Sequence, residues 1–201
     1  MPAALYEPGE KAMTTRRLLL GASLATPATW LLTAGPGVAQ LAPTPSCGDE
    51  PTPRQTEGPY FRPSSPERTN LRDAGVAGEP FMLSGLVLTT GCVPLAGAVV
   101  DIWHCDGEGD YDNRGFRCRG HQLTDADGRW RFETVRPGLY PGRTRHFHLK
   151  AQAAGSRLLA TQLYFPGEPG NARDGIWRHE LELVIGEGGT AGRFDLVLAP
   201  A

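Results

Sequence analysis

The chain has 201 residues, of which 20 are Lys or Arg and 22 are Asp or Glu, so its formal net charge is −2. This balance excludes the strongly basic composition of a nucleic-acid-binding protein, and the 40% share of hydrophobic residues excludes wholesale disorder. With 26 Gly and 18 Pro and no repeat period, the composition favours many turns, and therefore short strands over long helices.

The first part of the chain has the pattern of an export signal. Arg16 and Arg17 precede an apolar run that ends in small residues at Ala39. This order is typical of a secretory signal peptide, and the run is too short and too often interrupted for a membrane span. The paired arginines resemble a twin-arginine signal, with an ordinary secretory signal as the alternative. We therefore expect residues 1–39 to be a signal peptide, with Met13 as an alternative start. The mature chain would be periplasmic or secreted, without a membrane span.

The remainder of the chain predicts an extended arm followed by an all-β domain. Residues 40–75 are rich in Pro and charged side chains, and we expect them to lie over the domain that follows. Residues 76–201 alternate short apolar or β-branched runs with turns that contain Gly and Pro. This pattern predicts a β-sandwich of about seven to nine strands. The clearest strand patterns are at 82–90, 98–104, 129–133, 146–150, 158–165, 180–185 and 193–198.

Four cysteines, Cys47, Cys92, Cys105 and Cys118, lie after the predicted signal. An even number in an exported chain suggests two disulfides, for which three pairings exist. We favour Cys47–Cys92 and Cys105–Cys118, because the second bond would close a short excursion between neighbouring strands. A zinc site of four cysteines is the alternative, but its usual Cys-x-x-Cys spacing is missing.

The strand pattern at 146–150 carries the first candidate for chemistry. His146 and His148 are two residues apart, so their imidazoles face one side of the strand while Phe147 and Leu149 face the core. Two imidazoles on one face of a sheet can bind one metal ion, although such a pair also occurs as a structural feature.

Two loop tyrosines are candidate partners of this histidine pair. Tyr140 lies in the Gly- and Pro-containing loop that leads into the strand, and Tyr111 lies in the acidic loop 106–113. A loop tyrosine is ordinarily a packing residue. Next to a hard, strongly Lewis-acidic ion such as Fe(III), however, its phenol can ionise and become a ligand. A calcium loop is the alternative at 106–113, but it lacks the sixth-position Gly and the distal Glu of an EF-hand.

Four motifs in order resemble the intradiol ring-cleavage dioxygenases, which include the catechol and protocatechuate dioxygenases. They are the arm segment 52–61, the run 101–111 with its Asp-Ile-Trp-His-Cys-Asp start, the run 119–128 and the run 140–148. Together the motifs extend over roughly residues 47–170. Each motif alone is modest, whereas four in this order are specific.

The resemblance implies a β-sandwich whose loops carry an active site with non-haem Fe(III). By motif, Tyr111, Tyr140, His146 and His148 would be the metal ligands. Catalytic roles would fall to Tyr140 as the displaceable ligand, to Arg143 as an active-site arginine, and to Gln162 near the substrate. The implied reaction cleaves a catechol-type aromatic with O2, between its two hydroxylated carbons, to a cis,cis-muconate-type diacid. The other histidines, His104, His121 and His179, fall outside the ligand pattern; we expect packing roles for the first two and exposure for the third.

The sequence leaves the substrate and the class of function open. The loop between Tyr140 and His146 is short, which predicts an open site that admits bulky plant- or lignin-derived catechols. The alternative function is a non-catalytic exported carbohydrate- or ligand-binding module, in which Tyr60, Tyr111 and Tyr140 would stack on the ligand. A Zn or Cu enzyme that uses the histidine pair and a third His is a further alternative. We expect no nucleic-acid partner, and the sequence leaves open whether the chain forms a homo-oligomer.

Overall fold

The computed structural model describes residues 50–201, so the predicted signal peptide and the first part of the predicted arm lie outside the described residues. The described part is built from strands and two short 3-10 helices, which confirms the all-β prediction. The elements are β1 (Pro80–Thr89), β2 (Val99–Trp103), β3 (Arg119–Leu123), β4 (Arg129–Val135), β5 (His146–Gln152), β6 (Leu159–Tyr164), η1 (Asn171–Arg173), η2 (His179–Leu181), β7 (Val184–Ile185), β8 (Ala191–Arg193) and β9 (Leu196–Leu198).

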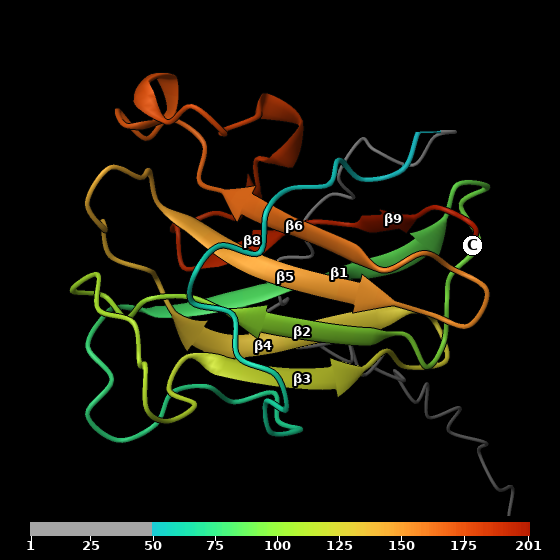
Figure 1. Cartoon of the computed structure of the whole chain (residues 1–201), viewed down its shortest axis with the longest axis horizontal. Helices are drawn as coiled ribbons and strands as arrows, with labels where there is room; N and C mark the ends of the chain where they lie inside the picture. Colours follow the sequence, from blue (N-terminus) through green and yellow to red (C-terminus); the bar gives the residue numbers. More distant parts are fainter. Residues whose placement is uncertain (1–49) are drawn as a thin grey trace, which may run out of the picture. The chain divides into compact units, whose positions relative to one another are not determined.

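The strands form two sheets that pack face to face. One sheet has the order β4-β1-β8-β7, with β9 also paired to β1, and the other has the order β3-β2-β5-β6. Figure 1 shows the second sheet in front of the first, with the loops that precede β5 and follow β6 at one end. This two-layer arrangement is the predicted β-sandwich.

The core lies between the sheets because the strands alternate buried and more accessible side chains. In β1, Phe81, Leu83 and Val87 are buried, whereas the residues between them are mostly half-buried. In β5, Phe147 and Leu149 belong to the core cluster. Since successive side chains of a strand point to opposite faces, His146 and His148 lie on the outer face of their sheet, as predicted.

Three strand predictions need correction. The predicted strand at 193–198 is interrupted, because β8 ends at Arg193 and β9 begins at Leu196. The segment Arg119–Leu123 forms an edge strand although it has little apolar alternation, because backbone pairing with β2 stabilises it. The predicted strand at 180–185 is wrong over most of its length. Its first two residues belong to η2, Glu182 forms an isolated bridge with Tyr164, and Val184–Ile185 pairs with β8.

The described part of the arm runs across both layers. The Gln55 amide donates to the carbonyl of Ala160 in β6 (2.8 Å), and the Leu71 amide donates to the carbonyl of Glu133 in β4 (2.8 Å). Leu71 is fully buried in the core. In Figure 1 the arm crosses the outer surface of the β3-β2-β5-β6 sheet, so it covers the face on which the two histidines lie.

The predicted Cys105–Cys118 disulfide is wrong, because both cysteines are free and buried. The His104 amide bonds to the Cys118 carbonyl (3.2 Å), so Cys105 is one position beyond the register of Cys118 on neighbouring segments. Side chains offset by one position tend to point to opposite faces. The Cys105 thiol instead lies 3.6 Å from the Gly138 carbonyl. Cys92 is disulfide-bonded, and its predicted partner Cys47 lies outside the described residues.

Within residues 50–201, no helix is long and apolar enough to cross a membrane.

Candidate metal centre

The two histidines of β5 aim the same ring nitrogen at one point. The Nε2 atoms of His146 and His148 are 3.1 Å apart. The Nδ1 atom of His146 lies 2.6 Å from the Thr144 carbonyl oxygen, which fixes the ring when Nδ1 carries the proton and leaves the Nε2 lone pair free. On the other ring, Trp103 stacks against His148 with centroids 5.1 Å apart and planes 10° apart. Both Nε2 atoms are therefore oriented to bind a shared ion.

Both imidazoles are held in the neutral form that binds metals. Burial, followed by the charge of Arg143, lowers the pKa of His146 to about 4. Burial, followed by the neighbouring His146, holds the pKa of His148 well below its ordinary value. A metal ion therefore does not have to displace protons from these nitrogens near neutral pH.

Tyr111 contributes a buried oxygen that has no partner. Its hydroxyl has no hydrogen-bond partner among residues 50–201, and burial raises the pKa of the phenol. Its ring lies edge-on to Tyr140 at 5.9 Å and 6.4 Å from the ring of His148. Buried hydroxyls ordinarily find a partner, so this one points to a group that would occupy the space between the rings.

Tyr140 is half-buried and is the fourth predicted ligand beside His146, His148 and Tyr111. Its centroid lies 6.5 Å from that of His146, and the Arg143 amide closes a turn onto its carbonyl (3.1 Å). Glycines allow its loop to approach that of Tyr111. A Cβ on Gly109 would lie 2.3 Å from the Leu139 carbonyl, and a Cβ on Gly138 would lie 2.4 Å from the Gly109 amide. Only glycine fits at either position, so the two tyrosine loops stay in contact.

Arg143 and Gln162, the two other predicted site residues, are hydrogen-bonded to each other. The Arg143 guanidinium donates to the Gln162 side-chain oxygen (2.6 Å) and to the carboxylate of Asp174 (2.8 Å). Burial alone would raise the pKa of Asp174, but the Thr144 amide and the Arg143 guanidinium bring this pKa below its ordinary value. The Gln162 amide in turn donates to the Thr56 carbonyl of the arm (3.0 Å). Arg143 is thus a fixed cation beside the metal centre.

Three residues of the site had no role in the metal centre predicted from the sequence. Tyr60 of the arm stacks on Tyr111, with centroids 4.1 Å apart and planes 10° apart. Trp103 stacks on His148, as described above, and Asp174 orients Arg143. Tyr60 lies within the arm motif 52–61 that resembles the family, so the sequence did offer a reason to expect it near the site. Nothing in the local sequence marks Asp174, because it meets Arg143 only in the folded chain.

The remaining histidines behave as expected. His104 is buried, with Nε2 2.7 Å from the Thr134 hydroxyl, and burial lowers its pKa to about 4. His121 contacts the Ser65 carbonyl (2.8 Å), and His179 is exposed. Among residues 50–201, no three His, Cys, Asp or Glu side chains gather into a metal site. The alternative with a third His therefore has no support among the described residues.

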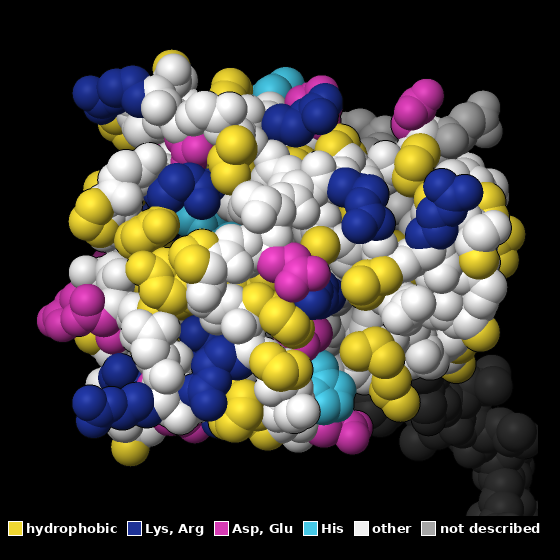
Figure 2. Space-filling view, viewed as in Figure 1, with side chains coloured by type: hydrophobic (Ala, Val, Ile, Leu, Met, Phe, Trp, Pro, Cys, Tyr) yellow, Lys and Arg dark blue, Asp and Glu magenta, His cyan; other side chains and the backbone are white. Residues whose placement is uncertain are grey.

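The binding-module alternative fits this arrangement poorly. Tyr60 and Tyr111 stack on each other, so at least one face of each ring is unavailable to a ligand. On the outer surface, Figure 2 shows basic, acidic and hydrophobic side chains interspersed over one face of the described residues, without a field of one charge.

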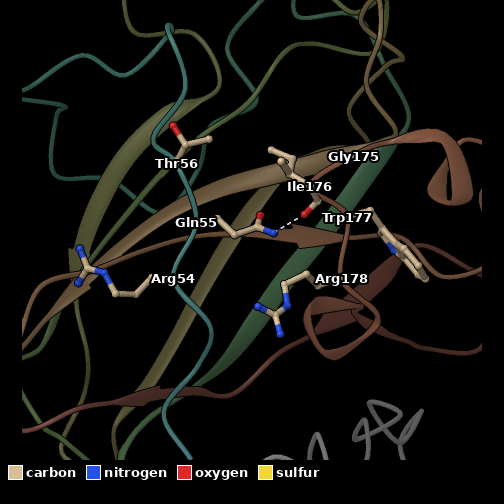
Figure 3. Close-up of a pocket in the computed structure, with 7 residues that line it drawn as sticks. All are labelled: Arg54, Gln55, Thr56, Gly175, Ile176, Trp177 and Arg178. Carbon is tan, nitrogen blue, oxygen red and sulfur yellow. Dashed lines mark hydrogen bonds between the residues drawn. The ribbon is translucent and has the colours of Figure 1, made fainter.

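A pocket of about 460 Å³ lies beside the site, between the arm and the segment 175–178. Figure 3 shows Gln55 reaching from the arm to the carbonyl of Ile176, with Trp177 and Arg178 beyond it. The Tyr164 hydroxyl lies 2.7 Å from the Gln55 side-chain oxygen and 3.3 Å from that of Gln162. The wall of the pocket is therefore linked by hydrogen bonds to the residues that hold Arg143.

The comparisons with known proteins place similarity over most of the described chain. A family model described as "Dioxygenase" matches residues 56–192. A protocatechuate 3,4-dioxygenase beta chain from Burkholderia cepacia is 35% identical over 120 residues, which are 50% of this chain and 51% of that protein. A chlorocatechol 1,2-dioxygenase from Rhodococcus opacus is 28% identical over 64% of this chain and 62% of that protein. The chain thus spans about half to under two thirds of the length of these curated relatives.

Two solved structures resemble the fold. The dioxygenase domain of a dioxygenase carbohydrate-binding protein fusion from the cellulolytic bacterium Streptomyces sp. SirexAA-E is 50% identical, with a TM-score of 0.72 over 76% of this chain and all of that chain. An intradiol ring-cleavage dioxygenase from Tetranychus urticae is 26% identical, with a TM-score of 0.68 over 75% of this chain and 95% of that chain.

Proposed function

Because the chain belongs to the intradiol ring-cleavage dioxygenase family, we propose that it cleaves a catechol-type aromatic with O2 between the two hydroxylated carbons, giving a cis,cis-muconate-type diacid. The observation that carries the proposal is the meeting of two neutral imidazoles, whose Nε2 atoms are 3.1 Å apart, with an unpartnered buried phenol. Simple ligand stacking or packing does not require this combination.

The residues of the site fit a ferric ion. His146 and His148 offer neutral nitrogens, and Tyr111 and Tyr140 offer oxygens that become anionic phenolates when bound. Two phenolates offset most of the ion's charge, and hard Fe(III) prefers such oxygens. A ferric ion held by these four residues would supply the Lewis acidity that draws electron density from a bound catecholate.

Arg143 would act on the substrate ring as a fixed positive charge. Its guanidinium is bound by the Asp174 carboxylate and the Gln162 amide oxygen, so it does not have to reorient when negative charge develops nearby. Preorganised charge of this kind lowers the barrier to steps that build up negative charge. Gln162 would hold both Arg143 and the arm, which forms one wall above the site.

Tyr140 is the ligand that can move. It lies in a short turn closed by Gly142, which has φ of +81°, and it is half-buried, whereas His146 and His148 are buried. Its phenolate oxygen can take up a proton from a substrate hydroxyl as the substrate binds.

The visible absorption spectrum tests the proposal. We expect the iron-loaded chain to be red from tyrosinate-to-iron charge transfer, and anaerobic catechol to shift the band to longer wavelength. Admitting oxygen should then bleach the shifted band with one O2 consumed per catechol. Tyr164→Phe should keep the colour, because Tyr164 is outside the proposed ligand set, whereas Tyr111→Phe should lose most of it. A colourless iron-loaded chain would contradict the proposal.

We also propose that the chain is exported through a twin-arginine route. The signal pattern with Arg16 and Arg17 supports this, as does the disulfide-bonded state of Cys92, since disulfides persist in oxidising compartments. Replacing both arginines with Lys should leave the protein in the cytoplasm of its host, as cell fractionation would measure. Export that is unaffected by the replacement would favour an ordinary secretory signal.

A further inference from the structure

Arg119 is a fully buried arginine that has no carboxylate partner. Its side chain is 1% exposed, and no Asp or Glu of residues 50–201 lies within ion-pair distance of it. The neighbouring Asp112 uses its carboxylate on the backbone amides of Arg114, Gly115 and Arg117. Burial and the neighbouring cation Arg62 lower the pKa of Arg119, and Asp112 offsets this only in part. Buried charges are ordinarily paired, so this one calls for a counter-charge.

The guanidinium of Arg119 holds Tyr111 from two sides. It donates to the Tyr60 carbonyl (2.6 Å), and Tyr60 covers one face of the Tyr111 ring. It also donates to the carbonyl of Asp112, the next residue along the chain from Tyr111 (3.1 Å). Its central carbon lies 6.0 Å from the centre of the Tyr111 ring, and its Nε atom has no partner among the described residues.

The strand register places Arg119 in line with the histidine pair. Arg119 of β3 is directly opposite Trp103 of β2, and Trp103 is directly opposite His148 of β5. Residues opposite one another on antiparallel strands share a face of the sheet. Arg119 therefore approaches the metal centre from the β3 side, whereas Arg143 approaches it from the loop before β5.

We propose that Arg119 is a positioning residue of the metal centre, which fixes Tyr111 between the arm and its loop and supplies the positive charge that a bound phenolate neutralises. This inference rests on the proposed function, because it requires Tyr111 to bind a ferric ion as an anion. Arg119 would contact neither the substrate nor the ion, and its effect on both would come from its hold on Tyr111.

Two replacements of Arg119 separate the effect of its charge from the effect of its hydrogen bonds to two carbonyls. A third replacement, at Arg68, controls for loss of contact between the arm and β3. Arg119→Gln removes the charge, and Arg119→Lys keeps a charge but loses the planar fork that reaches two carbonyls. Arg68→Gln removes a different bond between the arm and β3, from the Arg68 guanidinium to the Arg119 carbonyl (3.0 Å), without touching Tyr111. Fe(III) affinity is measured by chelator competition, and the position of the charge-transfer band is measured by absorption.

We expect Arg119→Gln to bind Fe(III) about 10- to 100-fold more weakly, as is typical when a residue that orients a metal ligand is lost. Its band should move to longer wavelength, because the phenolate electrons rise in energy when a nearby positive charge is removed. Arg119→Lys should keep the band position but bind iron more weakly than the unchanged chain. If Arg119→Gln does not fold, the iron affinity of Arg119→Lys still tests the inference.

Three results would overturn the inference. The first is that both Arg119 variants bind Fe(III) as tightly as the unchanged chain with the band unmoved. The second is that Arg68→Gln reproduces the losses of Arg119→Gln, which would reduce the role to anchoring of the arm. The third is an unchanged chain that shows no charge-transfer band with iron, which would overturn the proposed function and this inference with it.

Discussion

Replacing Tyr111 with Phe is expected to stabilise the metal-free protein. The Tyr111 hydroxyl is buried and has no hydrogen-bond partner among the described residues. A buried polar group without a partner costs about 1–3 kcal/mol of folding free energy. Phe keeps the ring that stacks on Tyr60 and leaves only the small volume of one oxygen unfilled. We therefore expect the free energy of unfolding to rise by about 1–2 kcal/mol.

A second buried tyrosine provides the matched control. The Tyr164 hydroxyl lies 2.7 Å from the Gln55 side-chain oxygen and 3.2 Å from the Ile176 carbonyl, and Tyr164 is fully buried. Tyr164→Phe removes the same atom from a partnered position and takes the hydroxyl donor away from the Gln55 side-chain oxygen. It should lower the free energy of unfolding by about 1–2 kcal/mol. Both replacements remove one tyrosine hydroxyl, so opposite changes in the free energy of unfolding would be due to the difference in hydrogen bonding between the two hydroxyls.

Urea unfolding with a chelator present measures both effects, and repeating it with Fe(III) measures what the hydroxyl gains from the ion. A ligand that binds only the folded state stabilises it, so iron should raise the stability of the unchanged chain and of Tyr164→Phe far more than that of Tyr111→Phe. If Tyr111→Phe loses as much stability as Tyr164→Phe in chelator, the hydroxyl has a partner and the reasoning is refuted.

Three further predictions follow from the geometry. Asp174→Asn should lower kcat/KM by at least about tenfold, equivalent to about 1.4 kcal/mol, because Arg143 loses its charged partner; unchanged kinetics would show that Asp174 does not position Arg143. His104 has a folded pKa of about 4 against 6.5 when unfolded, so its contribution to stability is present above pH 6.5 and is lost as the pH falls toward 4. At pH 5 this loss is about 2 kcal/mol, and His104→Gln should remove that part of the pH dependence of urea unfolding. Gly58→Ala should cost about 1–2 kcal/mol in thermal unfolding, because Gly58 has φ of +70° and the added Cβ would lie 3.1 Å from the His148 ring; stability equal to that of the unchanged chain would contradict this.

The parts of the site that could be predicted are those encoded by local periodicity. The spacing of His146 and His148 places both imidazoles on one face of a strand, and the apolar Phe147 determines which face that is. The loop tyrosines could be proposed because each lies next to a strand that the pattern identified. Residues that are two or three positions apart in a strand keep a fixed relative orientation in the folded chain, so the sequence was sufficient to predict that both imidazoles face the same side.

The residues that hold the site could not be predicted in the same way. Asp174 is 31 residues from Arg143, and no periodicity connects them. The edge strand β3, which carries Arg119, has polar side chains that favour no regular structure by themselves. The Cys105–Cys118 pairing was wrong for a related reason, since proximity of two strand ends does not determine which way their side chains point.

The register of one sheet connects the core to the chemistry. The pairing of β3, β2, β5 and β6 places Arg119, Trp103, His148 and Gln162 directly opposite one another in that order. A shift of β5 by one residue would turn Phe147 outward and both imidazoles into the core, so burial of Phe147 selects the register that exposes the histidines to the arm. The same register sets Trp103 against the His148 ring and places Gln162 within reach of Arg143. Hydrophobic packing between the sheets therefore determines which side chains meet outside them, and a substitution that loosens the core at Phe147 should disturb the proposed metal centre without replacing any of its four proposed ligands.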